Sequence, residues 1–459
     1  MITPSGNLTK SVAGILNAIR FGIGGEYAAG VPEAQDTTAS IKAVGEAILA
    51  YQSRSNAFCS ALVNRIIFEA IKIREYKNPW AFFKKGMLEY GETVEEIFVN
   101  LCDVRAYDPS QAASRLFQRK IPDVSTAFHA MNVQAEYPVT ISEDQLHQAF
   151  TGPGALNKFI AGIINSVYNA MNYDEFNLMK YMIAVLALEG KLPKAAISAP
   201  SAANSNSIVT VVKALSNDFT FMKDKYTMAG NKNFCPKEEQ YVLEQGELNA
   251  VIDVNTLASA FNIDKVEFAG KVVLFDDIAD IDFTRIAKIL GNDTTYSSFT
   301  DTQIGYLKKI RAIICAKDFF QVYDNLQKMT EAYNGDGLYY NYFLHKWQTL
   351  SASPFENVTM LTDQASAVSA VTVTGASTIS AAGKYQYAAA VTSTGFANKA
   401  VKFSIKATAS GGVSSLAKYS IDQYGYLTVE TDYATGKIDI IATSLEDDTV
   451  SDSLTVTVS

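Results

Sequence analysis

The sequence has few of the side chains that bind metals or act as nucleophiles. Its 459 residues include only four cysteines, at Cys59, Cys102, Cys235 and Cys315. They lie far apart and form no Cys-x-x-Cys pair, which is the spacing that zinc and redox motifs use. We therefore expect free thiols in a reducing compartment, with no metal site and no cofactor.

Histidine is equally scarce, and the three histidines are scattered. His129, His147 and His345 have no cysteine or second histidine at ligand spacing, whereas metal and nucleophile sites need convergent partners. No nucleophile with a base and an orienting group emerges, although such groups can lie far apart in a sequence. We expect no catalytic residue.

Acidic side chains cluster once, close to the middle of the chain. Carboxylates this close together could hold a hard cation, but no EF-hand spacing or fixed bidentate glutamate accompanies them, so a solvated loop is favoured. The cluster consists of Asp276, Asp277, Asp280 and Asp282.

Positive charge and long apolar runs are also lacking. The formal net charge is −9, which argues against a broad phosphate-binding surface and hence against a nucleic-acid binder. No apolar run reaches the roughly 18 residues of a membrane span, and the N-terminal segment lacks the pattern of a secretory signal. A cytosolic site of synthesis and no membrane partner are expected.

Periodicity places several elements along the first 350 residues. Helices are expected over 8–21 and 57–74 and from residue 155 through Leu186, where apolar residues repeat at helical spacing. A strand with one wet face is expected over 131–141, because apolar and polar residues alternate strictly there. Mixed α and β signals over 196–315, including a strand, helix, strand unit from Glu247, are followed by strands at 316–350.

The stretch FFKKGMLEYGETVEEIF, residues 82–98, fits none of these elements well. It is too charged and glycine-rich for ordinary core, and it carries no group that could do chemistry. Together with the strand at 131–141 it predicts a long β-hairpin excursion of roughly 60 residues, far longer than typical sheet strands. Such a hairpin has too little partner surface within its own subunit.

The composition changes at about residue 363. From 366 to the end there is no arginine, histidine, cysteine or tryptophan, and short alternating apolar runs are separated by glycines. Several short strands at near-regular spacing predict a β-sandwich. The expected core of this sandwich includes Phe403, Ile405, Leu427 and Val429.

Four segments resemble the major capsid proteins of small podoviruses of the Bacillus-phage Picovirinae type. They are NPWAFFKKGMLEYGETVEEIF, YDPSQAASRLFQRKIPDVSTAFH, FIAGIINSVYNAMNYDEF and QVYDNLQKMTEAYNGDGLYYNYFLHKWQTLSASPF. The similarity runs in order from the N-terminal arm to about residue 360. It implies an α+β fold of the Hong Kong 97 type, followed by a bacterial Ig-like domain of group 2. The tail resembles that Ig-like group independently, in VKFSI and in AKYSIDQYGYLTV around Asp422 and Gly425.

The resemblance implies a division of the chain. A capsid domain would span 1–362 and the Ig-like domain 366–459. Within the capsid domain the implied parts are an N-terminal arm (1–56), an E-loop (78–142), the spine helix and P domain (143–195), an A domain (196–315) and returning P-domain strands (316–362). Residues 282–308 depart from the family pattern, so their role is left open.

The resemblance also gives residues 82–98 a function. They would begin the E-loop, an arm that leaves its own subunit and lies across a neighbour. The implied contacts between subunits are Phe82, Phe83, Lys84, Lys85, Gly86, Tyr90 and Gly91.

The function expected from all this is that of a major capsid protein of a tailed double-stranded DNA phage. Hexamers and pentamers would form an icosahedral shell, with portal and scaffolding proteins as partners, host cytoplasm as the place of assembly, and DNA enclosed without specific binding. One alternative is a surface or secreted adhesion protein with an Ig-like domain. Another is a hydrolase with an accessory Ig-like module.

Overall fold

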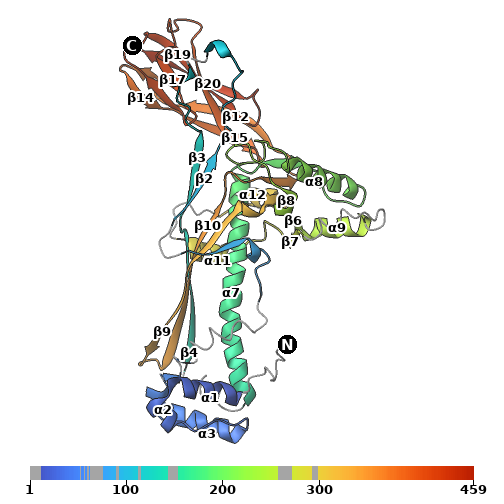
Figure 1. The fold of residues 1–459 in the computed structure, drawn as a ribbon, viewed down its shortest axis with the longest axis vertical. Coiled ribbons are helices and arrows are strands. Elements are labelled where there is room, and N and C mark those ends of the chain that lie inside the picture. The colour runs from blue at the N-terminus through green and yellow to red at the C-terminus, as the bar shows by residue number, and fades with distance from the viewer. Residues whose placement is uncertain are drawn as a thin grey trace.

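The molecule is elongated, and one long helix runs along its main axis (Figure 1). The computed structural model describes residues 12–51, 53–55, 57–58, 61, 76–88, 93–111, 115–142, 153–256, 271–291 and 298–459. N-terminal helices lie at one end of the long helix, and the C-terminal strands lie at the other end.

The long helix α7 spans Pro153–Leu188 and has 36 residues, which at 1.5 Å per residue makes it about 54 Å long. The sequence correctly predicted its existence and nearly its limits. It ends in a Schellman turn, in which Lys191 N donates to Leu186 O and Gly190 N donates to Ala187 O. Gly190 takes the left-handed conformation that this turn requires, with φ of +70°.

Three short helices pack against the N-terminal half of α7. They are α1 (Val12–Ile23), α2 (Gly25–Gly30) and α3 (Thr38–Leu49). Ile15, Leu16 and Ile19 of α1 are buried, as expected for the apolar face of the helix predicted at 8–21. The helix predicted at 57–74 lies mostly outside the described residues.

A four-stranded sheet lies alongside α7, with strand order β1-β9-β10-β4. Its strands are β1 (Lys84–Met87), β9 (Phe320–Asn334), β10 (Tyr339–Ala352) and β4 (Val133–Ser142). The β9–β10 hairpin turns at the predicted Asn-Gly-Asp-Gly sequence, where the side chain of Asn334 accepts from the backbone N–H groups of Asp336 and Gly337.

The predicted pairing of the long excursion was wrong. The strand expected at 131–141 is β4, and it pairs along its whole length with β10 rather than with residues 82–98. The pairs of the excursion are instead β2 (Val94–Val99) and β3 (Val124–His129), in antiparallel register. The reason lies in the tertiary packing of β4. Its Val133 and Ile141 are buried in the cores formed with α7 and the N-terminal helices, which fixes the register of β4 on β10.

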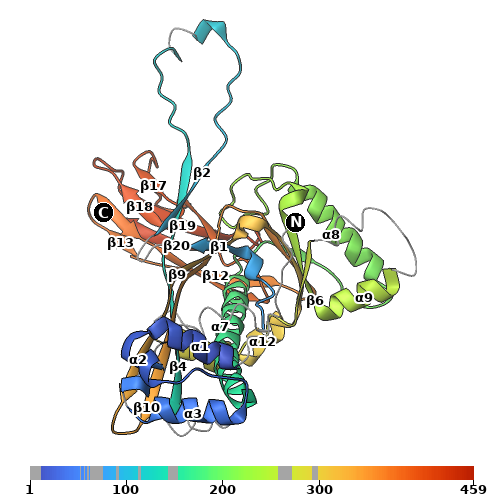
Figure 2. The same cartoon turned by 60° about the horizontal axis from the view of Figure 1, so that its bottom comes forward.

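Residues 94–129, which we call the extension, project far from the body of the molecule (Figure 2). The connection between β2 and β3 includes the short 3₁₀ helix η3 (Pro109–Gln111). Three further 3₁₀ turns, η2 (Ala81–Phe83), η4 (Lys237–Glu239) and η5 (Lys317–Phe319), lie in the body.

A five-stranded sheet with order β5-β11-β8-β6-β7 flanks the C-terminal half of α7. Alternate residues of β8 face opposite layers: Ile313 and Cys315 join the core around α7, whereas Ala312 and Ile314 pack under α8 and α9. The strands are β5 (Lys194–Ala196), β6 (Gln240–Gln245), β7 (Val272–Phe275), β8 (Ile310–Ala316) and β11 (Val358–Thr362).

The helices of this region are α8 (Ser205–Phe219), α9 (Gly246–Thr256), α11 (Phe283–Leu290) and α12 (Asp301–Leu307). The strand predicted from Glu247 is therefore a helix. Its β-branched residues mislead, since Leu248 and Ile252 lie one turn apart and bury the same helical face on the sheet.

The C-terminal region contains only strands and loops within 367–458, with its own apolar core. The strands form three groups, β12-β15, β13-β20-β19-β16 and β14-β18-β17. Leu427 and Val429 are buried in this core, and Phe403 and Ile405 are half-buried against it. The strands are β12 (Ala367–Thr374), β13 (Thr378–Ile379), β14 (Gly383–Gln386), β15 (Ala388–Thr394), β16 (Val401–Ala407), β17 (Tyr419–Ile421), β18 (Tyr426–Val429), β19 (Gly436–Ser444) and β20 (Ser451–Val458).

None of the helices within the described ranges combines the length and the apolar character that a membrane crossing requires.

Candidate functional site: the root of the extension

The aromatic pair that precedes the extension is anchored in its own subunit. Phe83 is only 2% exposed and its ring lies 4.4 Å from that of Phe320. Phe82 is 40% exposed and packs on Tyr241, with ring centroids 5.0 Å apart. Phe83, which the resemblance implies as a contact between subunits, is thus already covered by β9 and the surrounding core of its own subunit.

The remaining residues predicted as contacts between subunits also differ in their surroundings. Lys84 points into the body of the molecule, and Lys85 forms an ion pair with Asp318 at 3.0 Å. Gly86 adopts φ of +122°, and a Cβ built at this position would have no atom of the described residues within 4 Å beyond its chain neighbours. Tyr90 and Gly91 lie outside the described residues.

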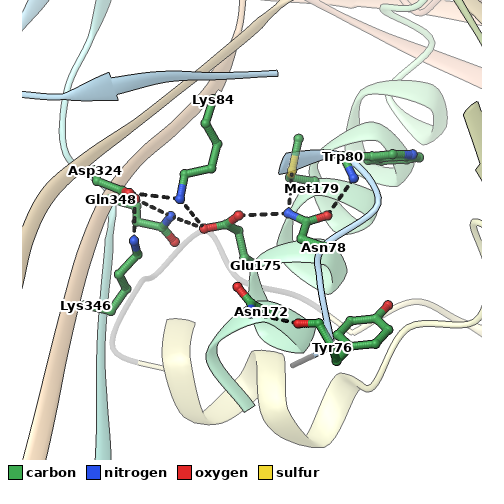
Figure 3. Close-up of polar contacts among 10 residues, drawn as sticks. All are labelled: Tyr76, Asn78, Trp80, Lys84, Asn172, Glu175, Met179, Asp324, Lys346 and Gln348. Atoms are coloured by element: carbon green, nitrogen blue, oxygen red, sulfur yellow. Dashed lines mark hydrogen bonds and ion pairs between the residues drawn. The ribbon is translucent and has the colours of Figure 1, made fainter. Parts of the chain in front are cut away.

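A polar junction lies beneath this segment, where α7, β1, β9 and β10 meet (Figure 3). At its centre Lys84 Nζ is 3.0 Å from Glu175 Oε2 and 2.8 Å from Asp324 Oδ2. Lys346 Nζ lies 2.6 Å from Asp324 Oδ1. The junction comprises Asn78, Lys84, Glu175, Asp324, Lys346 and Gln348.

Two amides complete the junction. Gln348 Nε2 donates to Glu175 Oε2 at 2.7 Å and to Asp324 Oδ1 at 2.9 Å. Asn78 Nδ2 donates to Glu175 Oε1 at 2.8 Å, and its own oxygen accepts from Trp80 N. Both carboxylates are therefore fully engaged, which buried charges require if they are not to destabilise the fold.

The electrostatics of the junction balance two lysines against two carboxylates. Burial lowers the pKa of Lys346, and the nearby Asp324 offsets only part of this effect. Burial would also lower the pKa of Lys84, but the charge of Glu175 and the contact with Asp324 outweigh it, so this pKa is raised. For Asp324 burial acts to raise the pKa, yet Lys346 and Lys84 hold it below its usual value.

The chain segment leading to the junction is tied directly to α7. Tyr76 N donates to Asn169 Oδ1, and Asn172 Nδ2 donates to Tyr76 O, both at 2.8 Å. These contacts and Asn78 hold the incoming chain along two turns of the helix (Figure 3). The extension thus starts from a fixed point.

A second set of contacts holds the base of the extension. Glu96 of β2 accepts from Ser353 Oγ at 2.6 Å and lies 3.0 Å from His129 Nε2. The other ring nitrogen of His129 lies 2.7 Å from Ser351 Oγ. His129 is therefore a buried structural histidine that joins β3 to β10.

Two further contacts hold this base. Asn231 Nδ2 donates to Asn100 Oδ1 at 2.8 Å, and Phe98 stacks on Phe355 with ring centroids 5.5 Å apart. The extension is fixed at its base.

Beyond its base the extension exposes apolar side chains. Val104, Tyr107, Phe117 and Ile121 are each about nine-tenths exposed, and an exposed apolar patch of this extent marks an interaction site. The whole exposed set is Ile97, Val99, Leu101, Val104, Tyr107, Leu116, Phe117, Ile121, Val124 and Phe128.

Three acidic side chains of the cluster at 276–282 bind other groups of the protein. Asp276 forms an ion pair with the buried Lys180 at 2.9 Å, and Asp282 caps α11 by accepting from Arg285 N. Asp277 accepts from the backbone of Ala279. Across the residues that the structure describes, no three His, Cys, Asp or Glu side chains converge to hold a metal.

The thiols of the body are poor nucleophiles. Burial raises the pKa of Cys235 to about 12, and it also raises the pKa of Cys315. Only the thiolate is reactive, so these residues serve packing. The geometry around the root of the extension is that of a mechanical support.

Comparison with known proteins identifies the family of this chain. A family model described as the Phi29-like phage major capsid protein matches residues 16–362. The chain belongs to this family. Its capsid relatives include the major capsid protein of Bacillus phage B103, which is 33% identical over 75% of this chain and 71% of the relative. The major capsid protein of Bacillus phage PZA is 31% identical over 86% of this chain and 84% of the relative.

The fold of the capsid chain is also found in a solved structure. One chain in the solved structure of the head fiber and inner core protein gp22 of native bacteriophage P68 superposes on this chain with a TM-score of 0.50. It is 16% identical, and the match covers 64% of this chain and 88% of that chain. This agrees with the α+β fold of the Hong Kong 97 type expected from the sequence.

This protein is a major capsid protein of a tailed phage, a component of the virion that assembles into a shell of many subunits. The adhesion protein considered as an alternative is not supported.

Sequence reasoning missed most of the junction. Glu175, Asp324, Lys346 and Gln348 come from three elements and meet only through tertiary contacts. One signal was available, because Asp174 and Glu175 interrupt an otherwise apolar stretch of α7. Charged residues on a buried helix need partners, although the sequence does not say which.

Proposed function

We propose that this capsid protein assembles as hexamers and pentamers into an icosahedral shell that encloses double-stranded DNA. The observation that carries the proposal is the extension, which exposes a series of large apolar side chains beyond a firmly anchored base. Rings need heterologous contacts, in which one surface of a subunit meets a different surface of the next. An arm that lies across a neighbour supplies such a contact.

In this proposal the E-loop that reaches the neighbour is residues 94–129 rather than the whole of 78–142. Phe82 and Lys85 remain candidate contacts at its root, with Gly86, Tyr90 and Gly91 between them and β2. Phe83 and Lys84 would act from within their own subunit by holding the root in place. The long helix and the β9–β10 hairpin would form the P domain, and the five-stranded sheet with α8 and α9 would form the A domain.

The C-terminal region, 366–459, is proposed to be a bacterial Ig-like group 2 domain that braces the outside of the shell. The turn between β17 and β18 supports this assignment, since Asp422 Oδ1 accepts from Tyr424 N and Tyr426 N. Gly425 at φ of +81° lies so close to Tyr387 O and the ring of Phe403 that a Cβ would clash. The residues that carry the sequence resemblance thus meet in space.

The partners proposed are a portal and a scaffolding protein, with assembly in the host cytoplasm. The net charge of −9 suits a container that encloses DNA without binding it specifically. We also propose that no residue is catalytic. A hydrolytic activity that one substitution abolishes without unfolding the protein would refute that statement.

The proposal is tested by the double substitution Phe117→Ser and Ile121→Ser in the full chain. Both side chains are almost fully exposed, so the subunit should keep its unfolding temperature. Assembly should weaken, because each apolar side chain buried at an interface contributes about 1.5–3 kcal/mol. Electron microscopy and sedimentation measure the yield of shells.

The matched control is Tyr424→Ser with Leu445→Ser, two exposed apolar side chains of the C-terminal region. This control should assemble normally. Normal yield and heat resistance of shells from the Phe117 and Ile121 variant would contradict the proposed role of the extension.

A further inference from the structure

The loop between β15 and β16 leaves the C-terminal region and enters the core beside α7. Phe396 in this loop is fully buried. Its ring does not join the core of the C-terminal strands but the cluster that contains Leu188 and Leu192. Tyr306 of α12 meets it edge to face, with ring centroids 6.3 Å apart.

Polar contacts surround this apolar insertion. Lys194 of β5 donates to Phe396 O at 3.2 Å and forms an ion pair with Glu446 at 2.6 Å. The second oxygen of Glu446 accepts from Asn398 N at 3.1 Å. One carboxylate therefore joins the inserted loop to a strand of the five-stranded sheet.

The end of α7 takes part as well. Lys399 Nζ donates to Leu188 O at 2.8 Å, and a cation at this position also matches the partial negative charge of a helix C-terminus. Gly190, which terminates the helix, lies so close to the loop that a Cβ would be 2.1 Å from Ala397 O. Glycine is needed here both for the turn and for the approach of the loop.

The connection between the two parts adds a further constraint. Asp363, which follows β11, pairs with Arg311 at 3.2 Å. Ser366, which precedes β12, accepts from Phe396 N at 2.9 Å. The linker and the inserted loop therefore hold each other.

We infer that residues 395–399 are a latch that fixes the C-terminal region to the end of α7. Its socket is formed by the last turn of α7, by β5 and by α12. The latch holds the C-terminal region in a fixed position relative to α7. Without it, the two parts would be joined only by a flexible linker. This goes beyond the bracing role proposed above, and it gives the 282–308 segment a function, because α12 supplies one wall of the socket.

If residues 395–399 are a latch, a substitution in them should change the local stability of the end of α7, and a substitution at the end of α7 should change that of the loop. In the full chain, Phe396→Ser should speed amide hydrogen exchange at residues 187–196 by roughly tenfold or more, because the end of α7 loses a buried neighbour. Tyr424→Ser, at an exposed position of the same region, is the control and should leave 187–196 unchanged.

The reverse experiment uses two glycines with the same backbone conformation. Gly190 has φ of +70° and faces Ala397, whereas Gly230 has φ of +72° and nothing within 4 Å of a Cβ. Gly190→Ala should therefore speed exchange at 395–399, and Gly230→Ala should not, although both carry the same backbone strain.

Lys399→Met is a milder variant that removes only the contact with Leu188 O, and it keeps the test decisive if Phe396→Ser does not fold. Faster exchange at 187–196 in Lys399→Met supports the latch. Wild-type exchange at 187–196 in every folded variant of Phe396 and Lys399 would overturn it, even if the shells assemble normally.

Discussion

Gln348 of β10 donates a hydrogen bond of 2.7 Å to Glu175 of α7, across 173 positions of sequence. The same amide also reaches Asp324 of β9. One side chain thus connects α7 to both strands of the long hairpin, beside the segment that leads to the extension. The stability of this junction decides how firmly the extension is held.

Glu175→Gln is expected to destabilise the subunit. It leaves the half-buried Lys84 and the buried Lys346 with one carboxylate, and breaking a buried ion pair by removing one partner costs about 3–5 kcal/mol. Denaturant unfolding of the unassembled chain measures the loss. Glu189→Gln, which removes an exposed partner of Lys191, should change little. A loss below about 1 kcal/mol for Glu175→Gln would show that the junction is not a structural support.

Phe82→Ser and Phe83→Ser should destabilise the folded subunit to different degrees. Phe83 is buried against Phe320, so its loss should cost about 3 kcal/mol or more of subunit stability. Phe82 is 40% exposed, and its loss should cost the subunit much less. Thermal unfolding of the two single variants checks this. Equal losses would mean that the two rings share one environment.

Glu356→Gln should change the dependence of stability on pH. Burial, followed by the charges of Asp318 and Glu96, raises the pKa of Glu356 to about 7, against the ordinary 4.5. Because the folded pKa lies above the unfolded one, stability from the protonated carboxyl is complete below about pH 4.5 and is lost as the pH rises through 7.

The variant should therefore match the wild type at pH 4 and be more stable at pH 8, by about 3 kcal/mol at most. Asp318, Glu96, Glu239, Lys85 and Cys235 are the titratable groups around this carboxyl. Unfolding midpoints at the two pH values measure the difference. A gain of the same size at both would exclude titration of Glu356 as the cause.

Residues 366–459 should fold as an isolated fragment. Their strands enclose a core of their own, which includes Leu427, Ile440 and Val456, and domains of about a hundred residues bury enough surface to fold alone. Circular dichroism should show β-structure and cooperative unfolding. Disorder in the fragment would contradict a domain boundary near 364.

The complementary chain ending at Asp363 should still form capsomers, but less stable ones. It would lack Phe396, which fills part of the core beside Leu188. If the shells of the shortened chain had the heat resistance of the wild type, the insertion of Phe396 would contribute nothing to the stability of the shell. Failure to form any capsomers would place the C-terminal region in the assembly interface itself.

Local patterns in the sequence were sufficient for the elements that repeat regularly. The apolar rows of α7, the alternation of β4 and the turn after Asn334 are each fixed by residues near one another in the chain. The strands after residue 367 follow from the same alternation. Such signals need no knowledge of distant partners.

The failures concern choices that tertiary structure makes. β4 could pair with any exposed strand edge, and its selection of β10 depends on the surface of α7. Phe83 looks unsatisfied in the sequence because its partner, Phe320, is far away in the chain. The junction and the latch were invisible for the same reason, since each gathers residues from several elements.

The length of α7 has a consequence for how a subunit can change shape inside a shell. One uninterrupted helix carries the N-terminal helices near its start and the C-terminal region at its end (Figure 1). A small tilt of α7 at one end therefore becomes a larger sideways displacement at its other end, about 54 Å away. Subunits at different positions of the shell would differ in the tilt of α7, and the pivot would lie at the polar junction, beside the segment that leads to the extension.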